Sequence, residues 1–317
     1  KYKAVMGPFS AGITAEKDPG ESFLSGSPPL PDFLSSFISW TGKGFLKKVI
    51  IGDYSARFGE GTNINTRMRT GISLSAPGYM TGRDEIRPYT STDENNFFRG
   101  AAAEMSYGNA GLSLMFSQNI IDAEISSSDS GELYVSGLYK PGLHNTESSI
   151  MKKDALRETF YGAGFNFNFP PVRLGLTWSQ SSFSLPLAPS GDDPEDLYRF
   201  SGRETGVFTA YYNTMFSRIL LFGEISADYS TDIALVQGFT LRPSDRLQIN
   251  MLGRNYSPAF VSFHGRGAGS SSSTSNESGL LGNFTFEAAR YLFISAGCDI
   301  VSYPWLKYRT RFPSTDS

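Results

Sequence analysis

The amino-acid sequence predicts an all-β fold: a transmembrane antiparallel up-and-down β-barrel of about 14 or more strands, with short periplasmic turns and long extracellular loops. Two observations predict it. Apolar and polar residues alternate with a period of two over segments of roughly nine to twelve residues, the length that a tilted membrane strand needs. The links between these segments alternate between short and long, which is the layout of outer-membrane barrels.

The alternation is clearest in residues 219–229. Ile219, Leu221 and Ile225 point one way, and Glu224 and Asp228 point the other way. By the same pattern we place strands at 9–17, 33–41, 45–57, 96–107, 111–121, 156–167, 171–181, 205–214, 218–229, 233–241, 246–256, 279–288 and 291–303. Residues 1–6 are expected to be the end of an earlier strand that turns at Gly7-Pro8.

The links between these strands are short at one end of the predicted barrel and long at the other end. The short ones are Gly42-Lys43-Gly44, Gly108-Asn109-Ala110, Asn168-Phe169-Pro170, Met215-Phe216-Ser217, Arg242-Pro243-Ser244-Asp245 and Arg290. The long ones are 18–32, 58–95, 122–155, 182–204 and 257–278, and only 230–232 is short on that side. A soluble β-sandwich also has period-two strands, but nothing forces its loops to alternate in length. The alternation therefore favours the membrane barrel.

Composition excludes several other classes. No window approaches the ~18 consecutive apolar residues of a transmembrane helix. A net charge of −3 with scattered Lys and Arg gives no basic stripe for nucleic acid. Cys298 is the single cysteine, so a disulfide framework and a thiolate metal cluster are excluded. Acidic residues at 192–196 offer oxygen ligands that calcium accepts, but without the spacing of an EF-hand we interpret them as a solvated loop. We expect no metal and no cofactor.

The chain is interpreted as one domain, residues 1–317, because no linker or change in charge divides it. We expect it to be incomplete, with sequence missing at the start and closing strands missing at the end. Bacterial single-chain barrels usually have an even number of strands. The last predicted strand is followed by polar sequence up to Ser317 rather than by a terminal aromatic strand end.

A series of short phrases runs in order along nearly the whole chain. They are Glu16-Lys17-Asp18-Pro19-Gly20-Glu21, Ile51-Gly52-Asp53-Tyr54, Arg57-Phe58-Gly59-Glu60-Gly61, Glu94-Asn95-Asn96-Phe97-Phe98-Arg99-Gly100-Ala101-Ala102-Ala103, Asn255-Tyr256-Ser257-Pro258, Asn276-Glu277-Ser278-Gly279 and Tyr303-Pro304-Trp305-Leu306-Lys307-Tyr308. Together they resemble a family of Bacteroidota outer-membrane proteins whose members carry a small helix-hairpin-helix region ahead of a large barrel. The resemblance implies a barrel fold and an outer-membrane location, and it implies no settled activity.

This chain departs from the family pattern in two ways. Glu60 stands where the family more often has Gln. The helix-hairpin-helix region is not among these residues, so a DNA-binding role suggested by that region does not transfer to this chain.

Enzymatic chemistry would need a nucleophile and its base. The two histidines, His144 and His264, both fall in long loops in polar surroundings, where an idle, solvent-exposed side chain is expected. We therefore expect no enzyme, with an outer-membrane hydrolase as the third alternative.

Charged side chains on the polar side of the alternation are candidates for the barrel lumen. They are Glu104, Glu158, Arg173, Glu224, Asp228, Arg254, Glu287 and Asp299. They either line a solute pathway and tune its selectivity, or pair with one another and with water inside a filled barrel. The mixture of signs favours pairing.

The long loop 58–95 is expected either to fold into the lumen as a plug or to form an outward platform. The candidate residues for that role are Asp53, Tyr54, Arg57, Phe58 and Arg99.

Two functions follow from the predicted fold. The first is a scaffold or accessory subunit of a multi-component outer-membrane complex, favoured by the large loops and by the lack of a single-sign charge ring. The alternative is a channel or porin for small polar solutes, since a barrel of this size can enclose water unless it is filled. The expected partners are outer-membrane lipid, lipopolysaccharide and other proteins of such a complex, with no nucleic acid.

Overall fold

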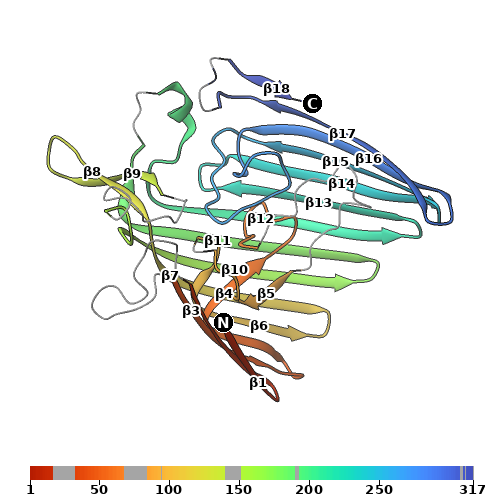
Figure 1. The fold of residues 1–317 in the computed structure, drawn as a ribbon, viewed down its shortest axis with the longest axis horizontal. Helices are drawn as coiled ribbons and strands as arrows, with labels where there is room; N and C mark the ends of the chain where they lie inside the picture. The colour runs from red at the N-terminus through yellow and green to blue at the C-terminus, as the bar shows by residue number, and fades with distance from the viewer. Residues whose placement is uncertain are drawn as a thin grey trace.

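The computed structural model is a single curved antiparallel sheet (Figure 1). It describes residues 1–16, 33–67, 84–93, 95–139, 151–189, 193–307, 310 and 312–316. Of the 18 strands described, four are short additions (β5, β8, β9 and β18), and the other 14 form an up-and-down meander in chain order. The meander consists of β1 (Tyr2–Met6), β2 (Phe9–Glu16), β3 (Phe33–Thr41), β4 (Leu46–Arg57), β6 (Phe98–Tyr107), β7 (Ala110–Ile121), β10 (Leu156–Phe169), β11 (Val172–Leu187), β12 (Gly202–Phe216), β13 (Ile219–Asp228), β14 (Ile233–Ser244), β15 (Leu247–Tyr256), β16 (Glu277–Ala289) and β17 (Leu292–Tyr303).

The prediction of an all-β, up-and-down antiparallel fold with about 14 strands is confirmed. Every strand expected from the alternation is present, with ends that differ by a few residues. The sheet is not closed, because β1 and β17 lie at its opposite edges and do not pair with each other in the part of the chain described (Figure 1). The short turns gather at one end of the strands and the long links at the other.

Three short strands and a helical turn lie within links that the sequence predicts to be loops, and a fourth short strand lies in the polar sequence after the last predicted strand. They are β5 (Glu85–Pro88), β8 (Ala123–Ser127), β9 (Leu133–Leu138), β18 (Ser314–Asp316) and the 3₁₀ helix η1 (Pro194–Tyr198). The strands are only three to six residues long, too short for a period of two to stand out. In η1, Pro194 supplies a preset φ in the first turn and is followed by acidic residues that suit a helix start.

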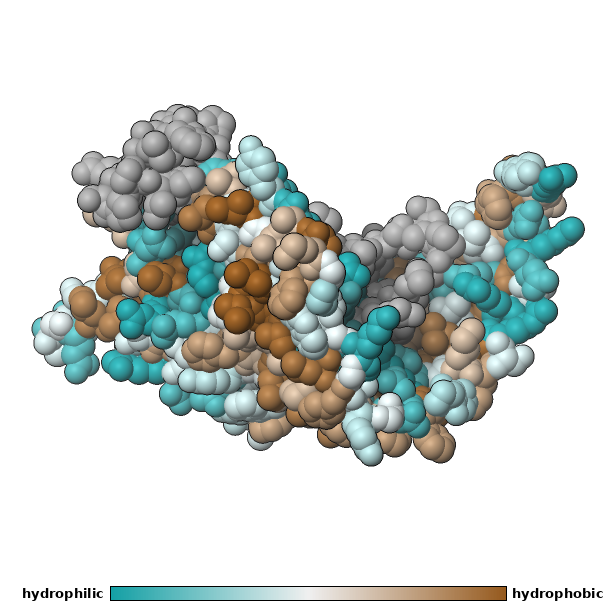
Figure 2. Space-filling model, turned by 90° about the horizontal axis from the view of Figure 1, so that it is seen from below, coloured by the Kyte–Doolittle hydropathy of each residue, from teal (hydrophilic) through white to brown (hydrophobic). Residues whose placement is uncertain are grey.

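The two faces of the sheet differ in chemistry. In β7, for example, Leu112, Leu114 and Phe116 are exposed on one face, while Ser113 and Ser117 are buried on the other. We call the first the outer face and the second the inner face. No Asp, Glu, Lys or Arg occupies an outer-face position in β7, β11 or β13–β17. Figure 2 shows one side of the molecule, on which apolar side chains gather in the middle and polar ones toward the margins.

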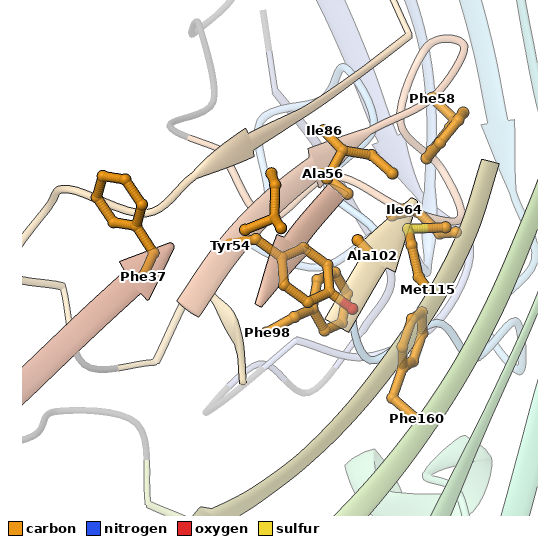
Figure 3. Packing of buried hydrophobic residues seen from close by; sticks show 11 residues of the cluster. Phe37, Tyr54, Ala56, Phe58, Ile64, Ile86, Phe98, Ala102, Met115 and Phe160 are labelled. Carbon is orange, nitrogen blue, oxygen red and sulfur yellow. The ribbon is translucent and has the colours of Figure 1, made fainter. Parts of the chain in front are cut away.

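The inner face is covered, and part of its covering is apolar. A cluster of buried residues joins inward side chains of β3, β4, β6, β7 and β10 to Phe58 and Ile64, which follow β4 (Figure 3). The rings of Phe98 and Phe160 stack at 4.3 Å between centroids. Burying this many large side chains fixes the chain after β4 against the inner face of the sheet.

Candidate functional site

Two segments fold onto the inner face and meet there. Residues 58–67, here the plug segment, follow β4, and residues 257–276, here the cap segment, connect β15 to β16. The plug segment is almost entirely buried and the cap segment is mostly half-buried, although both contain little regular structure. Buried irregular backbone needs partners for its N–H and C=O groups. The polar side chains of the inner face supply many of them.

Glu224, on β13, binds the plug segment through its carboxylate. It accepts hydrogen bonds from the backbone N–H of Glu60, from the backbone N–H of Thr62 at 2.8 Å, and from the Thr62 hydroxyl. The side chain of Glu224 is only 3% exposed. Hydrogen bonds to a buried carboxylate are stronger than neutral ones, so this contact is a principal anchor of the plug segment.

Two glycines make this close approach possible. Gly59 has φ +52°, and a Cβ there would lie 2.0 Å from a carboxylate oxygen of Glu224 and 2.9 Å from the ring of Tyr211. Gly61 has φ +86° and lies against Asn65. A side chain at either position would meet both backbone strain and a clash. The contact with Glu224 therefore explains Gly59, and the contact with Asn65 explains Gly61.

Asn63 continues the same contact toward the neighbouring strands. Its Nδ2 donates to the Thr177 hydroxyl and to the Val207 carbonyl, both at 3.2 Å. Its Oδ1 accepts from the Ser179 hydroxyl at 2.6 Å. Residues of β11 and β12 thus bind both the nitrogen and the oxygen of the Asn63 side-chain amide. The polar groups of the inner face are therefore complementary to those of the plug segment.

Asp84 forms a second charged contact beside the first. Its carboxylate accepts hydrogen bonds from the guanidinium of Arg173 and the hydroxyl of Tyr211, both at 2.5 Å, and from the backbone N–H of Gly59 at 3.0 Å. Arg173 and Asp84 are 21% and 5% exposed at their side chains. This residue of the long loop after β4 therefore neutralises an inward arginine of β11.

The cap segment binds the plug segment through the backbone. Asn65 N–H donates to the His264 carbonyl, and Arg266 N–H donates to the Gly61 carbonyl, both at 2.7 Å. A Cβ at Gly265 would lie 2.0 Å from the Thr62 carbonyl oxygen. The two segments therefore pack as one body inside the curve of the sheet.

A buried ion triad fixes the base of the cap segment. Arg254 binds Glu277 at 2.6 Å and Asp299 at 2.8 Å, and the side chains of Arg254 and Glu277 are fully buried. Glu277 also accepts from the backbone N–H groups of Ser270 and Ser271. The backbone of Ser270 and Ser271 is therefore tied to the sheet.

The prediction for His264 is wrong. Instead of an idle, exposed side chain, it is half-buried, with Nε2 2.8 Å from Glu158 and its ring 4.7 Å and 4.9 Å from those of Phe98 and Phe160. The cap segment carries it onto the inner face, which a local reading of the loop could not reveal. No described hydroxyl or thiol is hydrogen-bonded to it. His144 lies outside the described residues.

The predicted lumen-facing charges lie on the inner face, and most have partners. The paired side chains are Glu104 with Lys48, Glu158 with His264, Arg173 with Asp84, Glu224 with the plug segment, Asp228 with backbone N–H groups including that of Val261, and Arg254 with Asp299. The remaining one, Glu287, is half-buried near a short turn. In the described chain all of these charges except Glu287 have partners, and they form no ring of a single sign.

The predicted plug residues need correction. Only Phe58 lies in the plug segment; Asp53, Tyr54 and Arg57 belong to β4, and Arg99 belongs to β6. Tyr54 is buried on the inner face, with its hydroxyl donating to the Phe116 carbonyl at 2.9 Å. Asp53 and Arg99 pair at 2.9 Å on the outer face. The family-like phrases extend across strand ends, so membership in a phrase did not separate strand residues from loop residues.

The residues that make the principal contacts were not singled out from the sequence. Thr62, Asn63, Asp84 and Tyr211 are common residue types, and their partners lie roughly 90 to 160 residues away. The signal that could have drawn attention to the plug segment is its pair of glycines two residues apart, flanked by strand and turn residues.

The acidic stretch at 192–196 is described from residue 193 onward. There Asp196 pairs with Arg199 at 2.8 Å. Among the described residues, no group of three or more His, Cys, Asp or Glu side chains is arranged to hold a metal ion.

The described part of the chain contains no helix that is both long enough and apolar enough to cross a membrane.

The comparisons with known proteins concern both sequence and structure. No protein-family model and no curated protein matches the sequence. Among solved structures, the chain is similar to an anion-selective porin from Comamonas acidovorans, with 13% sequence identity and a TM-score of 0.37. The likeness covers 83% of this chain and 58% of the porin chain, so the present chain spans less than two thirds of that protein's length.

Proposed function

We propose that this chain is the wall and inner plug of an outer-membrane β-barrel, and that it acts as a scaffold or accessory subunit of an outer-membrane complex rather than as an open channel. The observation that carries the proposal is the filled inner face. The plug and cap segments occupy it, and Glu224, Asp84 and Arg254 bind them there through buried charged contacts.

The outer face supports the membrane part of the proposal. Large apolar side chains such as Leu114, Leu176 and Ile225 are 46%, 57% and 46% exposed, on strands without outward charges in their middle. A soluble protein seldom exposes so wide an apolar surface. A barrel wall requires it, because lipid contacts one face and the interior contacts the other.

The interior argues against conduction as the main role. A channel needs a continuous water-filled path lined by groups free to meet the solute. Here the inward charges other than Glu287 are paired with one another, with Asp84 or with the plug and cap segments, and removing such partners would leave buried charges at a high free-energy cost. Since the plug and cap segments occupy the inner face, the loops and rims are the surfaces that remain for contacts with other proteins.

Purification of the full-length protein from native membranes in mild detergent tests the scaffold role. We expect it to require detergent and to bring down other envelope proteins in fixed ratio. Recovery of the barrel alone, after gentle cross-linking as well as without it, would count against the scaffold role. A protein that stays in solution without detergent would count against the membrane assignment itself. The outer-membrane hydrolase alternative is tested on the same preparation with lipid and peptide substrates, where no turnover is expected.

A further inference from the structure

Two arginines lie on the outer face at the long-loop end of the two strands that flank β7. Arg99 is the second residue of β6 and Arg157 is the second residue of β10, and β7 runs between them. The register pairs Arg157 with Ile120 of β7, and Arg99 lies one residue before the pair Gly100–Ser117, opposite Gln118. Strands lie about 4.8 Å apart and rise about 3.4 Å per residue, so the two Cα atoms are about 12 Å apart. Gln118 and Ile120 of β7 lie between the two arginines on the outer face.

Arg99 is held in position while part of it stays accessible. Its Nε and Nη2 bind the buried carboxylate of Asp53 at 2.9 Å and 3.1 Å, and Nη2 also donates to the Leu34 carbonyl at 2.9 Å. Its guanidinium lies 5.1 Å from the centroid of the Phe97 ring. The side chain remains 46% exposed, and the structure gives Nη1 no hydrogen-bond partner among the described residues. A fixed arginine loses little conformational freedom when a ligand binds it.

Arg157 supplies the uncompensated charge. It is exposed, its side chain makes no ion pair with any described residue, and only its backbone N–H is bonded, to the Ser184 hydroxyl. Two further acidic residues, Asp122 and Asp154, line a cavity of about 100 Å³ that also contacts Arg99 and Lys153. Arg99, already paired with Asp53, therefore stands beside charges of both signs, whereas no acidic side chain occupies an outer-face position of β7 or β10 around Arg157.

Below the two arginines the outer face becomes apolar. The rings of Phe116 on β7 and Tyr161 on β10 lie 5.4 Å apart, both about 40% exposed, directly along the strands from Gln118 and Arg157. Cations above an aromatic pair above an apolar band reproduce the order of a lipid: charged headgroup, interface, acyl chain.

We propose that Arg99 and Arg157 form a binding site for the phosphate of an anionic membrane lipid, at the long-loop rim of the outer face. The guanidinium of Arg157 can donate two parallel hydrogen bonds to phosphate oxygens, and Nη1 of Arg99 supplies a further donor. The proposal rests on the membrane part of the proposed function, and it names a partner for the outer face. The acyl chains of the same lipid lie along Phe116 and Tyr161.

The test uses the purified full-length protein in detergent and three probes. They are lipid A with two phosphates, the same lipid after removal of its phosphates, and inorganic phosphate. Binding is measured by native mass spectrometry and by the change in unfolding temperature. We expect lipid A to bind and the dephosphorylated lipid to bind at least tenfold more weakly, because charged hydrogen bonds are lost. Inorganic phosphate at equal concentration is expected to have no effect, since it has no acyl chains.

Three variants distinguish lipid binding at this site from a general effect of positive charge on the protein. Arg157→Gln is expected to weaken lipid A binding about tenfold without lowering stability, because its side chain has no partner in the described chain. Arg99→Gln, combined with Arg157→Gln, is expected to weaken lipid A binding further. Arg246→Gln, an exposed arginine in the short turn at the opposite rim, is the matched control and is expected to bind as the unaltered protein does.

Equal binding of lipid A by the unaltered protein and by Arg157→Gln would overturn the proposal, as would an equal loss in Arg246→Gln. Inorganic phosphate that competes with lipid A would assign the site to free phosphate instead. These outcomes are distinct from a failure of the proposed function, which is recognised by a protein that needs no detergent.

Discussion

Replacement of Glu224 by alanine should release the plug segment while leaving the sheet folded. The carboxylate accepts two backbone N–H groups and the Thr62 hydroxyl. The hydroxyl keeps a second partner in Ser226, at 2.5 Å, so the variant leaves two buried backbone donors without their acceptor. Each such donor costs about 1–3 kcal/mol, which gives about 2–6 kcal/mol for the pair.

That free energy is local, because the strands keep their own hydrogen bonds. It corresponds to a rise of roughly 30-fold to 25,000-fold in the opening equilibrium of the plug segment. Hydrogen exchange of the full-length protein in detergent, followed by mass spectrometry, measures this directly. Amides of residues 59–66 should exchange faster by that factor, and amides of β7 and β10 should be unchanged.

Two variants make the comparison specific. Glu224→Gln keeps the shape and one acceptor oxygen but turns a donor toward a backbone N–H, so a smaller effect is expected. Glu287→Ala removes another inward carboxylate, one without a described side-chain partner, and should leave exchange of the plug segment as it was. Unaltered exchange in Glu224→Ala would refute the anchoring role, and so would equal loss of protection across the whole sheet.

Three further changes probe other contacts. Gly59→Ala combines φ +52° with a Cβ clash and should cost at least about 1–2 kcal/mol, seen as faster exchange of the plug segment; protection equal to that of the unaltered protein would contradict the strained contact. Arg254→Met leaves Glu277 buried without its cation and should cost about 3–5 kcal/mol in chemical denaturation, whereas a neutral or stabilising result would mean that the triad is dispensable. Leu114→Arg, in the middle of an outer-face strand, should lower stability in lipid by about 2–4 kcal/mol, and Gln118→Arg, nearer the rim, by clearly less; equal costs would argue against a membrane around this face.

Much of the fold could be predicted because each long strand must satisfy two environments. In β7 and β13 the requirement that one face be apolar and the other polar repeats every second residue, and this pattern is local. The same rule put Glu224 and Asp228 on the inner face. Ends of strands were placed by Gly, Pro and Asn in the turns, whose conformational preferences are also local.

The interior was less predictable, because its contacts join residues that are distant in the chain. Glu224 and Thr62 are separated by 162 positions, and Arg173 and Asp84 by 89. Nothing in the residues near Thr62 identifies the carboxylate that it will meet. The inward charges could be recognised as a group, but their individual partners depend on how the loops after β4 and β15 fold back.

His264 illustrates the same limit. Its neighbours Phe263 and Gly265 suggest an exposed loop, and only the three-dimensional arrangement brings Glu158 and the rings of Phe98 and Phe160 around it. Asp53 and Arg99 illustrate another limit of prediction from the sequence. Their phrases resemble those of a family, but resemblance did not distinguish an outer-face ion pair from a plug contact.

The most direct measurement of the central claim is the conductance of the purified full-length protein in a planar lipid bilayer. Glu224→Ala, combined with deletion of residues 59–66, serves as the opened control. The filled inner face predicts that the unaltered protein inserts without stable open channels and that the altered protein gives a large, reproducible conductance. Stable channels of uniform size from the unaltered protein would contradict the claim that its own segments close the interior.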